Sequence, residues 1–296
     1  MRSQENSAAL SNGISSNHLY LEKTDFNIHY LQAGNHADNN EVILLIHGWP
    51  TSSFLYRHMM KPLAQFCNVI AIDLPGFGLS DKDPNASYSF KYHAAIIDNL
   101  LSTLKIERVH LVVHDLGGPI GLWWAKQHSK KVASYVLLDT IVYDDFSWAV
   151  KLFVSMTLIP GIKNWFSRRG GIKFSMKLGL KNKHRLNKPV LEAYQAPFKS
   201  KDDRQSLLRT AHKLHINGFK DVAEHMESTD KPLCMIYAKN DVILPEVKDT
   251  FSRLKKRHSS AELHSIPECG HFLQEDCPEA VLKPLLSFYH RVKASD

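Results

Sequence analysis

The feature that most constrains the fold of this chain is an alternation of short apolar runs with longer segments of helical spacing. In the first half of the chain, apolar runs of strand length lie at 41–47, 68–73, 109–113 and 132–138. Segments with helical spacing lie between them, at 53–67, 90–104 and 119–127. Runs made almost entirely of Val, Ile and Leu are typical of strands buried on both faces, as in parallel sheets. We therefore predict an α/β fold with a mostly parallel central sheet flanked by helices.

This alternation is interrupted once, by a long segment that the sequence predicts to be mainly helical. The segment runs over residues 143–226, and strands and helices alternate again from residue 232 onwards. We expect residues 19–142 and 227–296 to form one core, with 143–226 as a helical cap inserted into it. Residues 1–18 are rich in Ser and Asn, which predicts a loose N-terminal tail.

Charge and composition restrict the partners of such a protein. The chain has 37 Lys and Arg against 30 Asp and Glu, with the excess concentrated between Lys163 and Lys188. This cluster is either a patch for an acidic partner or a solvated helical face. It lacks the interleaved aromatic residues of a nucleic-acid site, and no apolar run reaches the roughly 18 residues of a membrane helix. We expect no nucleic-acid partner and no membrane partner.

Location and assembly are predicted from similarly simple features. The N-terminus is polar and lacks the apolar core of a secretory signal. The four cysteines show no CxxC spacing and no disulfide framework, which favours a reducing compartment. We expect a cytoplasmic protein, either a monomer or a weak homodimer.

The residues that carry chemistry follow the predicted strands. In parallel α/β sheets, reactive groups collect at the carboxyl ends of the strands. Asp115 follows the third buried run, Asp241 follows the strand after the helical segment, and His271 follows the last strand. Two acids and a histidine thus reach one edge in the order nucleophile, acid, base. Asp139, after the run 132–138, is the alternative to Asp241 as the acid that orients His271.

Asp115 has the strand, tight turn and helix context of a nucleophile elbow. Gly117 and Gly118 allow the sharp turn that exposes the middle residue. Where the common motif carries Ser, this chain carries Asp, although helix N-capping is the structural alternative for that residue. Serine attack on a saturated carbon ends in a stable ether, whereas a carboxylate forms an ester that water cleaves. Asp115 therefore indicates attack on a carbon–halogen bond or an epoxide.

These motifs resemble the α/β-hydrolase superfamily, and within it the aspartate-nucleophile branch of haloalkane dehalogenases and epoxide hydrolases. The resemblance covers about residues 20–295, including the position of the cap. It implies that Asp115 is the nucleophile and that His271, oriented by Asp241, is the base. It also implies an oxyanion hole formed by the backbone N–H groups of Trp49 and Leu116. No metal and no organic cofactor is expected, because no ligand cluster or phosphate-binding loop occurs.

The two branches place different demands on the site. Dehalogenases carry a Trp directly after the nucleophile to hold the leaving halide, but Leu116 occupies that position here. Trp49, or Trp148 or Trp165 from the cap, would then supply the missing N–H. The segment 193–198 also resembles part of a dehalogenase cap.

Epoxide hydrolases instead need a cap tyrosine that donates a proton to the opening ring. Tyr143 and Tyr194 are the tyrosines within the predicted cap. We expect a hydrolase acting with water on a small apolar substrate, as a haloalkane dehalogenase or alternatively as an epoxide hydrolase. A general ester hydrolase and a non-catalytic binding protein are the remaining readings.

Overall fold

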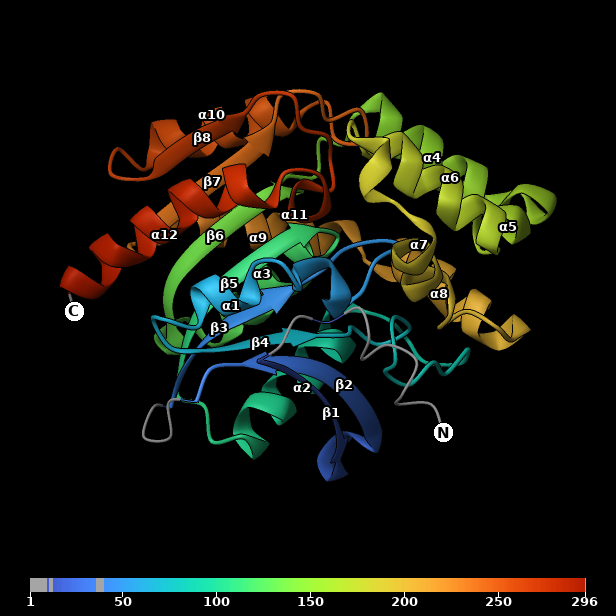
Figure 1. The fold of residues 1–296 in the computed structure, drawn as a ribbon, viewed down its shortest axis with the longest axis horizontal. Helices are drawn as coiled ribbons and strands as arrows, with labels where there is room; N and C mark the ends of the chain where they lie inside the picture. The colour runs from blue at the N-terminus through green and yellow to red at the C-terminus, as the bar shows by residue number, and fades with distance from the viewer. Residues whose placement is uncertain (1–9, 11–12, 36–39, 296) are drawn as a thin grey trace.

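An eight-stranded sheet forms the centre of the molecule (Figure 1). The computed structural model describes residue 10, residues 13–35 and residues 40–295. The strand order is β1-β2-β4-β3-β5-β6-β7-β8, in which β1 and β2 are antiparallel to their neighbours and the other strands pair in parallel. The strands are β1 Ile14–Leu21, β2 Phe26–Ala33, β3 Glu41–Ile46, β4 Asn68–Ile72, β5 Arg108–Asp115, β6 Val132–Thr140, β7 Leu233–Ala238 and β8 Glu262–Ile266.

Helices cover both faces of this sheet, as the apolar character of its strands requires. Every residue of β5 except the first is buried, because helices pack on each side of it. One row consists of α2 (Phe90–Thr103), α3 (Gly117–Gln127), α9 (Ile216–Ser228) and α10 (Val247–Arg257), each in contact with the next. The opposite face carries α1 (Met60–Leu63) and α12 (Pro278–Ser295), which contact each other (Figure 1).

The segment between β6 and α9 forms a separate group of helices beside the carboxyl ends of the strands (Figure 1). Side chains that accept a hydrogen bond from the first turn start three of these helices: Ser147 at α4, Asn187 at α7 and Ser200 at α8. The helices are α4 Trp148–Leu158, α5 Pro160–Phe166, α6 Arg169–Gly179, α7 Lys188–Gln195 and α8 Lys201–Lys213, with the short 3-10 helix η5 Lys183–Arg185 between α6 and α7. We refer to α4–α8 with η5 as the cap.

Three boundaries differ from those expected. Helix α9 belongs to the core rather than to the cap, because Phe219 packs on Phe90 of α2 with ring centroids 5.4 Å apart. Strand β1 begins at Ile14 and pairs with β2, so residues 14–18 are not a loose tail; residues 1–9 and 11–12 lie outside the described part. The expected helix 53–67 is a 3-10 turn, η3 Ser53–Tyr56, followed by the short α1, which contains Pro62.

None of the helices in the described ranges combines the length and the apolar character needed to cross a bilayer.

Candidate active site

A tight turn presents Asp115 at the end of β5. Asp115 has a φ of +50°, a conformation that non-glycine residues rarely adopt and that is common at functional sites. A Cβ atom on Gly117 would lie 2.3 Å from the carbonyl oxygen of His47, and one on Gly118 would lie 1.6 Å from Thr140 Oγ1. Only glycine at these two positions allows α3 to start this close to β3 and β6. This close approach explains why Gly117 and Gly118 follow soon after Asp115.

The Asp115 carboxylate is held from two directions. The backbone N–H of Trp49 donates a hydrogen bond to Oδ1 (2.7 Å), while Oδ2 lies 3.4 Å from His271 Nε2. Burial by itself raises the pKa of this carboxyl group, but the His271 ring and the Leu116 N–H outweigh burial and lower it. Asp115 is therefore ionised, with one oxygen fixed and the other facing the histidine.

His271 lies in the loop after β8 and makes its strongest contact with Asp241. Its Nδ1 donates to Asp241 Oδ2 (2.8 Å), and Asp241 Oδ1 accepts from the N–H groups of Ile243 (2.7 Å) and Leu244 (2.9 Å). Burial lowers the pKa of the His271 ring, but the carboxylates of Asp241 and Asp115 outweigh it and raise that pKa well above its usual value. Nε2 is left free of hydrogen bonds within the described structure.

Asp139, the alternative acid, also lies beside this pair but is engaged elsewhere. Its carboxylate accepts the N–H of Ala238 at 3.0 and 3.2 Å, although its oxygens lie within 4.8 Å of the facing atoms of Asp241 and His271. Burial, followed by the neighbouring Asp241 charge, raises the pKa of Asp139 well above its usual value. Asp241 is therefore the hydrogen-bonded partner of His271. Because Asp241 and His271 already bind each other, this trio is a poor set of metal ligands.

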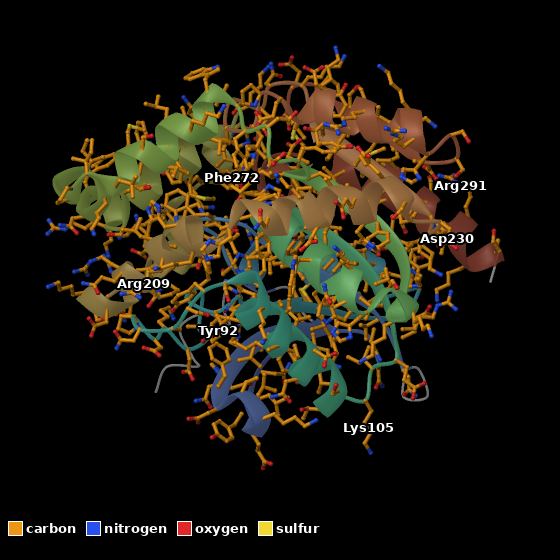
Figure 2. The ribbon with its side chains drawn as sticks, turned by 180° about the vertical axis from the view of Figure 1, so that it is seen from behind. Tyr92, Lys105, Arg209, Asp230, Phe272 and Arg291 are labelled. Carbon is orange, nitrogen blue, oxygen red and sulfur yellow. The ribbon has the colours of Figure 1, made fainter. Side chains whose placement is uncertain are left out.

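A cavity of about 820 Å³ opens between the cap and the core in front of Asp115. Its lining is largely apolar, with Phe153 from α4, Phe174 from α6 and Phe272 from the His271 loop; Figure 2 labels Phe272 where the cap meets the core. Among the described lining residues, Asp115 supplies the sole carboxylate. A largely apolar site with one carboxylate suits a small apolar substrate.

The indole N–H of Trp49 is the cavity-lining donor that best matches the indole N–H expected to bind a halide. The ring lines the cavity and packs against Phe153, with centroids 4.7 Å apart. Its Nε1–H is buried and has no hydrogen-bond partner in the described part of the chain. Leu116 also lines the cavity, but its side chain has no donor. The Trp49 indole therefore offers an unpaired N–H in the wall of the cavity that Asp115 also lines.

The four cap residues considered as donors are not placed for that role. Trp148 lines only the outer part of the cavity, because its side chain is 72% exposed, and Trp165 does not line it. Tyr143 lies outside the cavity beneath Arg253, whose guanidinium carbon lies 3.7 Å from its ring centroid.

Tyr194 points away from the cavity for a different reason. Its hydroxyl donates to Glu275 Oε2 (2.8 Å), and Glu275 in turn binds Arg57 through both oxygens. Burial, together with the Glu275 charge, raises the pKa of Tyr194 well above its usual value. Sequence reasoning missed this buried cluster, although Glu275 lies four residues after His271. It also missed His114, whose Nε2 donates to the His271 carbonyl (3.0 Å).

Comparison with known proteins identifies the fold family. A family model described as the alpha/beta hydrolase fold matches residues 41–278. The chain belongs to the α/β-hydrolase family. The predicted fold class and superfamily are thereby confirmed, and the protein is an α/β-fold hydrolase.

Several relatives of this α/β hydrolase are named for their activities. A haloalkane dehalogenase of Psychrobacter cryohalolentis is 27% identical over 286 residues, which cover 91% of this chain and 89% of the relative. A cis-3-alkyl-4-alkyloxetan-2-one decarboxylase of Shewanella oneidensis is 25% identical over 283 residues, which cover 91% and 87%. The crystal structure of a haloalkane dehalogenase DbeA loop variant from Bradyrhizobium elkanii superposes with a TM-score of 0.82 at 22% identity, covering 96% of this chain and 99% of that one. The structural likeness supports the fold, while function must be argued from the site.

Proposed function

We propose that this hydrolase attacks a saturated carbon of a small apolar electrophile with Asp115, as a haloalkane dehalogenase does. The observation that carries the proposal is the state of the Asp115 carboxylate. Oδ1 is already bound by the Trp49 N–H (2.7 Å), and Oδ2 lies beside His271 Nε2 in front of an apolar cavity. A nucleophile and a base in this arrangement support covalent catalysis.

In the first step, Asp115 Oδ2 attacks the carbon that bears the halogen. The carbon–halogen electron pair leaves with the halide, and an alkyl ester forms on Oδ2. The unpartnered Trp49 Nε1–H donates a hydrogen bond to the leaving halide. Oδ1 becomes the carbonyl oxygen of the ester and is already in contact with the Trp49 backbone N–H.

In the second step, His271 Nε2 takes a proton from water, and the water oxygen attacks the ester carbon of Asp115. The negative charge that develops on Oδ1 is stabilised by the N–H groups of Trp49 and Leu116. Collapse releases the alcohol, whose oxygen takes the proton from His271. The Asp115 carboxyl group then releases the second proton of the water to solvent and is again ionised. Esterification removes the Asp115 charge that helps to raise the His271 pKa, so the imidazole loses its proton more readily when a base is needed.

Opening a strained cyclic ester is a second candidate reaction. Leu116 leaves a single indole N–H for a halide, which is a sparse halide site. Asp115 would attack the saturated ring carbon that is bonded to the ring oxygen of a dialkyl oxetan-2-one. The bond between this carbon and the ring oxygen breaks, and the leaving group is a carboxylate that stays attached to the substrate and needs no halide donor. Loss of CO₂ would then expel Asp115 and leave an alkene, without consuming water. The Shewanella oneidensis relative, named for decarboxylating such compounds, supports this candidate.

The epoxide alternative has less support, because it needs a cap tyrosine that donates a proton to the epoxide oxygen. No tyrosine lines the cavity among the residues that the structure describes.

The test is intact-mass spectrometry of a His271→Ala variant incubated separately with 1,2-dibromoethane, styrene oxide and a cis-dialkyl oxetan-2-one. Without its base, the enzyme should retain a bromoethyl ester that peptide mapping places on Asp115. The matched control is the His271→Ala, Asp115→Asn double variant, which should acquire no mass. Alkene and CO₂ from the oxetanone would support the second candidate, because that route needs no base. A folded His271→Ala protein without adduct or product from any of the three would refute the proposal.

A further inference from the structure

The outer faces of three cap helices, α4–α6, carry an unusual set of side chains. Of the eleven large hydrophobic side chains that are exposed in the described structure, eight belong to the stretch from α4 to α6. We define the cap patch by six of them, two on each helix: Trp148 and Leu152, Ile162 and Trp165, Phe174 and Leu178. Exposed apolar clusters of this size mark interaction sites in monomeric proteins.

The cap patch is continuous across the helices and surrounds the opening of the cavity. The rings of Trp165 on α5 and Phe174 on α6 are in contact, with centroids 5.5 Å apart. Trp148 and Leu152 of α4 and Phe174 of α6 also line the active-site cavity while they remain 72%, 49% and 48% exposed. Side chains that are both exposed and cavity-lining lie at its mouth. The patch therefore faces solvent where a substrate enters.

Positive charge is interleaved with this patch and negative charge is missing from it. Residues 146–191 include ten Lys and Arg but neither Asp nor Glu. Lys173 and Lys177 are exposed beside Phe174 and Leu178 on α6, and Lys151 is exposed beside Leu152 on α4. These three lysines form no ion pair with any described carboxylate. Their charges are therefore available to an external partner.

This combination of features suits one kind of partner better than others. A second copy of the chain would place two positive faces against each other, which opposes self-association. Nucleic acid would satisfy the cations but leave most of the aliphatic side chains without a partner. An anionic bilayer satisfies both, because Trp residues favour the headgroup level and Lys side chains reach out to lipid phosphates while their stems stay in the apolar layer.

We propose that the cap patch docks on the surface of a membrane containing anionic lipid. Helices α4–α6 lie together at one end of the molecule, away from β1 and β2 (Figure 1). Binding is interfacial and requires no spanning helix. The expectation of no membrane partner rested on the absence of spanning segments and did not consider this mode.

Docking in this orientation turns the mouth of the cavity towards the acyl chains. A substrate dissolved in the bilayer then enters the cavity without crossing water. This consequence rests on the proposed function, whereas the docking itself does not.

The test measures flotation of the full-length protein with phosphatidylcholine vesicles containing 30% phosphatidylserine, and with phosphatidylcholine alone. Binding to the anionic vesicles should weaken with added salt and shift the tryptophan emission to shorter wavelength, because Trp148 and Trp165 enter the interface. The variant Lys163→Glu, Lys173→Glu should lower the vesicle affinity by at least about tenfold. Ile162→Ser, with an exposed side chain outside the cavity, should lower it without changing turnover of a water-soluble substrate.

The control is Lys61→Glu, Lys256→Glu, which reverses two exposed charges on α1 and α10 and should leave vesicle binding nearly unchanged. Equal loss in both charge variants would overturn the proposal. Failure of the protein to bind anionic vesicles would also overturn the proposal. Dimerisation through the cap patch, or binding of an oligonucleotide, would then identify the partner of the patch as a second copy of the chain or as nucleic acid. The assay contains no substrate, so its failure is distinct from a failure of the proposed function.

Discussion

A buried ion pair between Arg57 and Glu275, both in the core, offers the sharpest test of how burial determines the cost of losing a charge. Arg57 follows η3, Glu275 lies in the short helix α11 (Leu273–Asp276), and Tyr194 of α7 donates to the same carboxylate at 2.8 Å. The two Arg57–Glu275 contacts are 2.7 and 2.6 Å. The side chains are only 4% and 1% exposed. The change to make is Glu275→Gln, which preserves shape and removes the charge.

The expected loss follows from burial. Removing one partner of a buried pair leaves the other charge without compensation and costs about 3–5 kcal/mol of the free energy of unfolding. For a chain of 296 residues, an unfolding entropy of roughly 2.1 cal/mol/K per residue converts this loss into a fall in Tm of about 5–8 °C.

The matched control is Glu279→Gln at an exposed ion pair, which links the cap to the core. Arg185 of η5 and Glu279 of α12 lie 3.3 Å apart, but their side chains are 36% and 74% exposed. Such a pair contributes about 0–1 kcal/mol, so Tm should fall by no more than about 2 °C. Arg57→Met combined with Glu275→Gln should recover part of the loss, because no buried charge is then left alone.

The measurement is the Tm by scanning calorimetry at pH 7 of the unmodified protein, the two single variants and the double variant. Equal, small shifts for Glu275→Gln and Glu279→Gln would refute the argument that burial determines the cost of losing the charge.

Three further predictions concern the site and the core. Trp49→Phe removes the indole N–H that has no partner in the described structure. It should slow cleavage of the carbon–halogen bond in a single turnover by roughly a hundredfold to a thousandfold and leave ester hydrolysis unchanged; an unaltered cleavage rate would argue against halide binding there. The pKa of Asp115 is lowered and that of His271 raised, so ester formation should persist below neutral pH while ester hydrolysis slows as His271 becomes protonated. Quenched-flow mass spectrometry should show more ester at acid than at alkaline pH, and the reverse would contradict the assignment. Burial opposes ionisation of Asp73, but His29 outweighs it and depresses the pKa of that carboxyl; its stabilising effect is therefore present above the unfolded pKa and lost as pH falls. Asp73→Asn should lower the urea midpoint at pH 7 and flatten its decline between about pH 4 and 2.

Much of the core was predictable because its information is local. Near-continuous apolar runs predicted β3, β4, β5 and β6 within a few residues, since a strand buried on both faces needs apolar side chains at every position. The parallel arrangement places all carboxyl ends at one edge. The order Asp115, Asp241, His271 therefore predicted a cluster that the structure shows with a 2.8 Å bond between the last two.

The boundaries that the sequence missed depend on distant partners. Helical spacing in 216–226 shows that one face of that segment is buried, but not that Phe219 packs on Phe90 of the core. Likewise, β1 is an edge strand whose pairing with β2 decides its structure more than its own mixed composition.

Sequence alone thus determined the fold class and which residues meet at the edge of the sheet, because periodicity and the order of residues after strands carry that information. Tertiary structure alone decided which side chains reach the cavity. Tyr194 is a cap tyrosine in either view, but its hydroxyl is bound by Glu275, 81 positions later in the chain. The aromatic and basic residues of the cap fit a buried helix or a solvated one equally well by spacing. Their exposure around the cavity mouth results from how α4–α6 pack. The spacing of residues shows which side chains share one face of a helix, but only the packing of the helices decides whether that face contacts the core or solvent.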